Sequence, residues 1–232
     1  MTSGLTPREQ VKAILTSTPP PLTERILVLT DELYLEETTE RKVVISDGIL
    51  WQGDITTLQV DAIVNAANSQ LLGCFHPFHK CIDNAIHSAA GPRLREACHQ
   101  LMLRQGHTEP TGQAKITPGF FLPAKYVIHT VGPIVAHLTP TPLQEEQLAS
   151  CYKSCLEVAH AKGDIQSIAF CCISTGVFGY PPALAAKVAI RTVYNWVAAH
   201  PESPVQKVIF NVFSDADYQI YQKELAVWNS GN

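Results

Sequence analysis

Residues 61–101, DAIVNAANSQLLGCFHPFHKCIDNAIHSAAGPRLREACHQL, determine the architecture of this chain. The apolar run at 61–67 predicts a buried strand, and the residues from Asp83 onward carry helical periodicity. Between them lies a short loop after Gly73 that contains two cysteines and two histidines. A strand is also predicted for VVISDGILW, residues 43–51, so the main domain opens with two strands and a helix.

The same alternation continues to the end of the chain. Strands are predicted for KYVIHTVGP, SIAFCCIS and QKVIFNVF, and helices for residues 144–163, 182–200 and 215–228. Strands that alternate with helices form a parallel-rich sheet covered on both faces. We therefore expect an α/β fold, a three-layer α/β/α sandwich whose mixed sheet is mostly parallel.

The first 41 residues have a different pattern. Helical periodicity over residues 6–36 is interrupted by the TPPP run at 18–21 and then resumes. This pattern predicts an N-terminal helical extension, residues 1–41, before a main domain at 42–228. Its apolar face must pack on that domain or on a partner.

Composition limits the possible functions. The chain has 232 residues, 46% of them hydrophobic, and a net charge of −4. No Lys/Arg run offers phosphate contacts, so nucleic acid is not an expected partner. The chain has no leader-like start and no 18 consecutive apolar residues, so neither secretion nor a membrane is expected. Seven cysteines, an odd number, several of them in apolar contexts, favour the reducing cytoplasm.

The loop CFHPFHKC, residues 74–81, predicts a zinc site. Thiolate and imidazole are preferred zinc ligands, and Cys74, His79 and Cys81 can converge on one ion if the chain turns at Pro77. A three-ligand site with one open position is the catalytic arrangement. His76 could be a fourth ligand, and a loop of reduced thiols without metal is the alternative.

Other polar residues fall at strand ends, where ligands bind in open α/β sheets. The segment ISTGVFGYP, residues 173–181, is either an anion-binding cradle of backbone N–H groups or only a tight turn. Asn65 and Asn68 can bond a polyol or form a turn. Asp54 and Asp83 can each be a helix cap or a functional carboxylate, and His87 is expected to face the core.

The order of these motifs resembles that of the macrodomains. WQGDIT, DAIVNAANSQLLG, DNAIHSAAG, ISTGVFGYP and VIFNVF are similar to the successive signatures of that fold over about residues 42–228. In place of a glycine-rich loop the chain has GCFHPFHKCIDN, which resembles the loop of zinc-dependent macrodomains linked to microbial class M sirtuins. The resemblance makes residues 73–84 a zinc-containing catalytic loop.

The resemblance implies an ADP-ribose site. Asp54 and Ile55 would hold the adenine and Phe213 would pack on its ring, while Asn65 and Asn68 would face the distal ribose. The diphosphate would be wrapped by the loop Ser174, Thr175, Gly176, Val177, Phe178, Gly179 and Tyr180. One Zn²⁺ per chain would be bound by Cys74, His79 and Cys81, with Cys81 also beside the ligand. Asp83 and Asn68 are the expected catalytic residues.

The implied activity is zinc-dependent removal of mono-ADP-ribose from proteins modified on acidic side chains, which would reverse sirtuin-type modification. The implied partners are a mono-ADP-ribosylated protein, possibly a lipoylated carrier, and a linked sirtuin-type ADP-ribosyltransferase. Two alternatives use the same pocket: a reader that binds ADP-ribose without hydrolysing it, and a deacetylase of O-acetyl-ADP-ribose. A structural α/β domain with an incidental cysteine loop is the remaining alternative.

Overall fold

A central sheet organises the molecule, which is described by a computed structural model for residues 4–17, 20–45 and 48–231. Within these residues the sheet has six strands in the order β1-β6-β5-β2-β4-β3. Their bounds are β1 Leu50–Gln52, β2 Ala62–Ala67, β3 Ala114–Pro118, β4 Tyr126–Val131, β5 Ser167–Phe170 and β6 Lys207–Val212. Every pairing is parallel except that of β3 with β4. The prediction of a mixed, mostly parallel sheet is confirmed.

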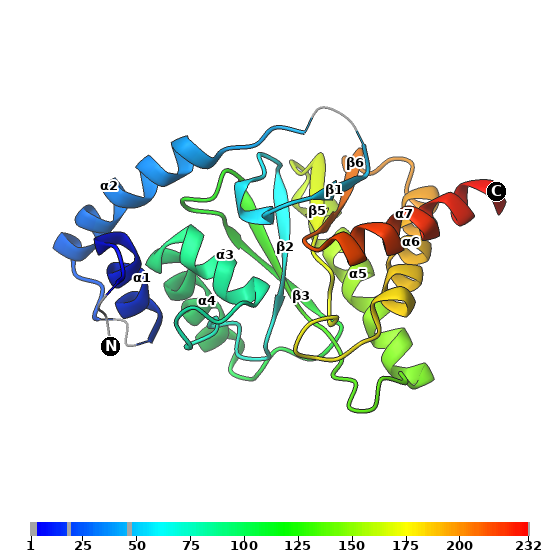
Figure 1. Ribbon diagram of the computed structural model, residues 1–232, viewed down its shortest axis with the longest axis horizontal. Helices are drawn as coiled ribbons and strands as arrows, with labels where there is room; N and C mark the ends of the chain where they lie inside the picture. The colour runs from blue at the N-terminus through cyan, green and yellow to red at the C-terminus, as the bar shows by residue number, and fades with distance from the viewer. Residues whose placement is uncertain (1–3, 18–19, 46–47, 232) are drawn as a thin grey trace.

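Helices cover both faces of the sheet (Figure 1). On one side lie α3 (Ile82–Ala90) and α4 (Pro92–Gln105), and on the other α5 (Pro142–Lys162), α6 (Pro182–Ala199) and α7 (Asp215–Gly231). The central strands are buried on both faces, as their continuous apolar runs predict. The three-layer α/β/α prediction is therefore confirmed.

Two local predictions differ from the structure, and one strand was not predicted at all. The single helix expected after Asp83 is two helices, because Gly91 has φ 82°, a left-handed conformation that ends α3, and Pro92 begins α4. Of the strand expected at 43–51, the structure forms β1 only from Leu50, with an isolated bridge earlier at Val43. Residues 46–47 lie outside the described part of the chain. The antiparallel edge strand β3 was not predicted.

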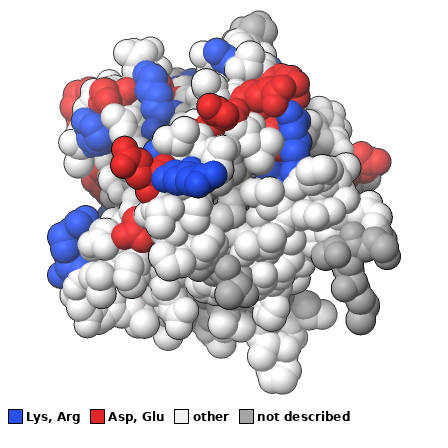
Figure 2. Space-filling model, turned by 90° about the vertical axis from the view of Figure 1, so that its left-hand side faces the viewer, with Lys and Arg blue, Asp and Glu red and all other residues white. Residues whose placement is uncertain are grey.

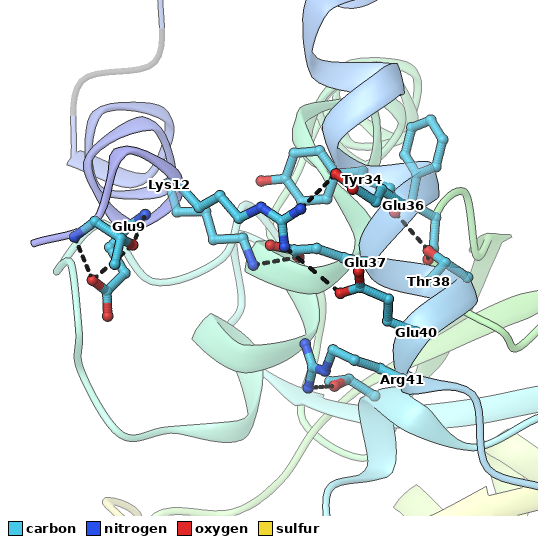
Figure 3. A network of polar contacts seen from close by, with 12 residues as sticks. Glu9, Lys12, Tyr34, Glu36, Glu37, Thr38, Glu40 and Arg41 are labelled. Atoms are coloured by element: carbon cyan, nitrogen blue, oxygen red, sulfur yellow. Dashed lines mark hydrogen bonds and ion pairs between the residues drawn. The ribbon is translucent and has the colours of Figure 1, made fainter.

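The N-terminal extension forms α1 (Pro7–Ser17) and α2 (Glu24–Arg41), which lie beside α3 and α4. The predicted interruption lies between them, although residues 18–19 of the TPPP run are outside the described part. Ion pairs join the two helices (Figure 3): Lys12 to Glu37 at 2.6 Å and Arg8 to Glu36 at 2.5 Å. Tyr34 is buried with its ring 5.8 Å from that of Phe121. The extension therefore packs on the main domain, while the boundary at residue 42 stays a prediction.

Charged side chains of both signs are interspersed on the face that Figure 2 shows, over its upper part. No broad patch of a single sign is visible there, which agrees with the small net charge of −4. Among the helices of residues 4–17, 20–45 and 48–231, none combines the length and apolar character needed to cross a membrane.

Candidate functional site

A cleft of about 490 Å³ opens at the carboxyl ends of the parallel strands. This is where ligands bind in open α/β sheets, and the volume is within the range of small-molecule sites. The cysteine loop supplies one wall and the loop after β5 the opposite wall. The lining residues that were predicted from the sequence are Asn68, Cys74, His79, Cys81, Asp83, Ser174, Thr175, Gly176, Val177, Phe178 and Phe213.

The loop after β5 presents unpaired hydrogen-bond donors. Ser174 has φ 66°, and the turn behind it is closed by a bond from Tyr180 N–H to the Ser174 carbonyl. Within the described part of the chain, the N–H groups of Gly176, Val177 and Phe178 donate no hydrogen bond. The Ser174 hydroxyl is likewise buried without a partner. Unpaired donors just before helix α6 form the kind of backbone concavity that binds phosphate groups.

The cysteine loop brings Cys74, His79 and Cys81 together. Their ligand atoms lie within 4.8 Å of one another, and Cys74 Sγ is 3.7 Å from His79 Nδ1. Tetrahedral zinc with bonds of about 2.0 to 2.3 Å separates its ligand atoms by about 3.6 to 3.8 Å. The two sulfurs and one imidazole therefore fit zinc in chemistry and in spacing. His76 is exposed and is not part of the cluster.

Local bonds determine the shape of this loop. Gly73 has φ 83°, and a Cβ there would lie 2.9 Å from the ring of His87, so only glycine fits. Cys81 caps helix α3 by accepting a bond from the Asn84 N–H through Sγ, and the Asn84 amide donates to the His79 carbonyl at 3.0 Å. Two of the expected ligands are thus anchored to the start of one helix.

Asp83 is buried at the inner end of the cleft, one residue into α3. Its Oδ1 accepts a 2.7 Å hydrogen bond from the Asn65 amide, and burial raises the pKa of its carboxyl to about 6. His87 lies one turn further along, with Nε2 3.6 Å from the same oxygen. His87 is buried, as predicted, and its burial lowers the pKa of the imidazole well below the usual value.

Asn65 itself is placed differently from the prediction. It is completely buried and is not part of the cleft wall, because its side chain points from β2 towards Asp83 and His129. Asn68 does line the cleft, and its amide donates to the Gly73 carbonyl. Of the two asparagines expected at the distal ribose, the structure thus brings only Asn68 to the cleft.

The residues expected at the adenine are separated. Phe213 lines the cleft and is 78% exposed, so its ring is available to a ligand. Ile55 is buried, and the carboxylate of Asp54 already accepts hydrogen bonds from Arg41 at 2.6 Å and from Thr56. Neither Asp54 nor Ile55 is part of the cleft wall.

The last two residues of the predicted diphosphate loop also lie outside the cleft wall. Gly179 and Tyr180 lie behind the cleft, where Tyr180 is buried. Sequence reasoning missed other lining residues, which come from strand ends and from α7: Ala66, Ala67, Gly132, Cys171, Cys172, Asn211 and Asp217. Their position near the carboxyl ends of predicted strands was the signal that could have found most of them.

These features agree with comparisons to known proteins. The model of the Macro domain family matches residues 64–189, more than half of the chain, so the chain belongs to that family. Among curated relatives, a protein from Treponema medium named protein-ADP-ribose hydrolase is 54% identical over 177 residues, which cover 76% of this chain and 66% of that protein. One of the same name from Staphylococcus aureus strain MRSA252 is 48% identical, covering 82% and 71%.

Solved structures give the same result for the fold. The Oceanobacillus iheyensis macrodomain with ADP superposes with a TM-score of 0.70 at 40% identity, covering 81% of this chain and 97% of that one. The Trypanosoma brucei macrodomain in complex with ADP-ribose superposes with a TM-score of 0.69 at 31% identity, covering 95% of this chain and 96% of that one. The macrodomain fold predicted from the sequence is confirmed. The chain spans about two thirds to seven tenths of the two curated relatives.

Proposed function

We propose that this protein hydrolyses the bond between mono-ADP-ribose and a modified protein, and that it does so with zinc bound by Cys74, His79 and Cys81. The observation that carries the proposal is that this cluster, Asp83 and the unpaired N–H groups of the loop at 174–178 line one cleft. The names of the curated relatives support the activity.

The chain's own groups supply binding and orientation. The N–H groups of Gly176, Val177 and Phe178 bind the diphosphate, and Phe213 packs on the adenine. This grip directs the distal ribose towards Asn68 and Asp83 at the inner end of the cleft. Fixing the reacting carbon against a positioned group supplies a large part of the rate enhancement in such reactions.

Asp83 is the group placed to handle a proton. Its carboxylate orients a water molecule and accepts a proton from it as the water attacks the anomeric carbon and the bond to the protein's oxygen breaks. A positioned general base of this kind typically contributes about 10²- to 10⁴-fold in rate.

Cys74, His79 and Cys81 would bind the zinc. It would supply Lewis-acid chemistry, polarising an oxygen of the substrate or of water. The anchoring of Cys81 and His79 to the start of α3 holds two of these ligands next to Asp83.

We further propose that the substrate linkage is an ester to an aspartate or glutamate side chain. The modified protein would be the product of a sirtuin-type ADP-ribosyltransferase, with a lipoylated carrier as the candidate target, and the reaction would take place in the cytoplasm. The linkage and the partners come from the resemblance of the cysteine loop to the sirtuin-linked subgroup, and the cytoplasm from the cysteine content of the chain.

The test is release of ADP-ribose from a protein that carries one ADP-ribose on an acidic side chain. We expect multiple turnovers for the wild-type protein and loss of about 10²-fold or more for Asp83→Ala. His76→Ala changes an exposed residue of the same loop that does not line the cleft, so it is the matched control and should retain the rate.

Binding of ADP-ribose without release would make the protein a reader. Turnover of O-acetyl-ADP-ribose but not of the modified protein would make it a deacetylase of the free metabolite. Either result would contradict the proposal.

A further inference from the structure

A line of buried polar side chains lies behind the cleft. It crosses three neighbouring strands, from Thr117 on β3 through His129 on β4 to Asn65 on β2, and ends at Asp83 on α3. All four residues are at most 5% exposed. Buried polar groups carry a large desolvation cost, so such a line needs a physical reason.

The contacts are continuous. Thr117 Oγ1 lies 2.9 Å from His129 Nε2, His129 Nδ1 lies 3.2 Å from Asn65 Nδ2, and Asn65 Nδ2 lies 2.7 Å from Asp83 Oδ1. Asn65 and His129 are direct partners in the pairing of β2 with β4, so the sheet register brings them together.

The direction of each hydrogen bond follows from the chemistry of Asn65. Its amide nitrogen only donates, so His129 Nδ1 must accept, and the proton of the neutral imidazole is on Nε2, facing Thr117. Complete burial lowers the pKa of His129 to about 3, which keeps the ring neutral and Nδ1 an acceptor at ordinary pH.

The carboxylate of Asp83 determines which end of the Asn65 amide faces it. If the amide turned over, its oxygen would face the carboxylate oxygen of Asp83, which is repulsive while Asp83 is ionised. The amide therefore keeps both N–H groups bonded, and Asn65 Oδ1 is left buried without a partner. Within the described residues no hydrogen bond engages Asp83 Oδ2.

We propose that Thr117, His129 and Asn65 form a positioning relay for Asp83, which fixes one carboxylate oxygen and leaves the other free for the cleft. The relay residues touch no ligand and are positioning residues. Their role in turnover rests on the proposed hydrolase function, whereas their hydrogen-bond geometry does not.

The kinetic test is a double-mutant cycle between His129 and Asp83. His129→Phe removes the acceptor and should lower kcat by about 10- to 100-fold, because the carboxylate loses its fixed orientation, while ADP-ribose binding changes less than about twofold. In the Asp83→Ala background the same change should have no further effect on kcat. A further loss of similar size in that background would overturn the relay.

Thr130→Val is the matched control. Thr130 is the next residue on β4 and is completely buried, but its hydroxyl donates to the Gln113 carbonyl, away from Asp83. It should cost stability and leave kcat of the folded protein unchanged. If Thr130→Val lowered kcat as much as His129→Phe, any disturbance of β4 would be enough to lower kcat, and the proposal would be contradicted.

A second measurement does not depend on turnover, and its main observation needs only the wild-type protein. The ¹⁵N shifts of His129 in the wild-type protein should show an unprotonated Nδ1 and a protonated Nε2, and Thr117→Val should perturb the Nε2 signal. The opposite tautomer would overturn the relay. If the expected tautomer were found but the protein showed no turnover, the hydrogen-bond geometry would stand and the proposed hydrolase function would be contradicted.

Discussion

Replacing His129 with glutamine should make the protein less sensitive to mild acid. His129 is completely buried on β4, and burial lowers the pKa of its imidazole from about 6.5 to about 3. Its neighbours are Asn65, Thr117, Cys98 and the ring of His87, none of which is a carboxylate in direct contact. The charged form therefore has no compensating partner in the folded state.

The size of the effect follows from linkage. Between pH 6.5 and pH 3 the unfolded chain binds a proton at His129 that the folded chain does not bind, so the free energy of unfolding falls as the pH is lowered through this window. Each pH unit costs about 1.36 kcal/mol, so lowering the pH from 7 to 5 should cost about 2 kcal/mol through this residue alone.

Urea denaturation at pH 7 and pH 5 measures the difference. The wild-type protein should lose about 2 kcal/mol more than His129→Gln over this interval, because glutamine does not titrate. Ionisable groups remote from position 129 are unchanged in the variant, so their pH dependence cancels in the comparison. His129 also lowers the pKa of His87, so the change at His87 in the variant adds to the excess loss of the wild-type protein. Equal losses in the two proteins would refute the idea of a neutral, uncompensated His129.

Three further changes test other parts of the structure. Arg95 Nε donates to the Leu72 carbonyl at 2.9 Å, two residues before the predicted zinc loop. Arg95→Ala should therefore weaken zinc binding about tenfold in a chelator competition, and an unchanged zinc affinity would contradict this. Phe213→Ala should weaken ADP-ribose binding by about 2- to 10-fold by calorimetry with no change in Tm, since the ring is 78% exposed; unchanged affinity would remove Phe213 from the site. Asp61→Asn should lower the free energy of unfolding at pH 7 by about 1 to 3 kcal/mol. Burial raises the pKa of Asp61, but hydrogen bonds from Lys125 and the backbone lower it by more, so the net pKa is below 3.8. The stabilisation by Asp61 should therefore fade as the pH falls below about 3.8. A stability loss in Asp61→Asn that persists in stronger acid would contradict this.

Sequence patterns found the layers of this fold because each central strand is mostly apolar and each helix has its own periodicity. They missed β3 because AKITP is a short edge strand whose pairing with β4 depends on tertiary contacts. They joined α3 to α4 because Ala90 and Leu94, four residues apart, are both buried and continue the helical pattern across Gly91.

The candidate site shows the same limit. The cluster of Cys74, His79 and Cys81 could be predicted because its ligands are close in the sequence. The position of Asn65 could not, because residues alternate between the two faces of a strand and the sequence does not say which face of β2 meets α3. Likewise, only the structure shows that Arg41, at the end of the extension, bonds the carboxylate of Asp54.

The most direct test of a zinc-dependent hydrolytic centre compares two histidines of one loop. Zinc content and release of ADP-ribose from a mono-ADP-ribosylated protein would be measured for His79→Ala and His76→Ala side by side. We predict that His79→Ala loses both bound zinc and turnover, whereas His76→Ala retains both, because only His79 lies within 4.8 Å of both cysteine sulfurs in the cluster. Full turnover by a zinc-free His79→Ala protein would contradict the account.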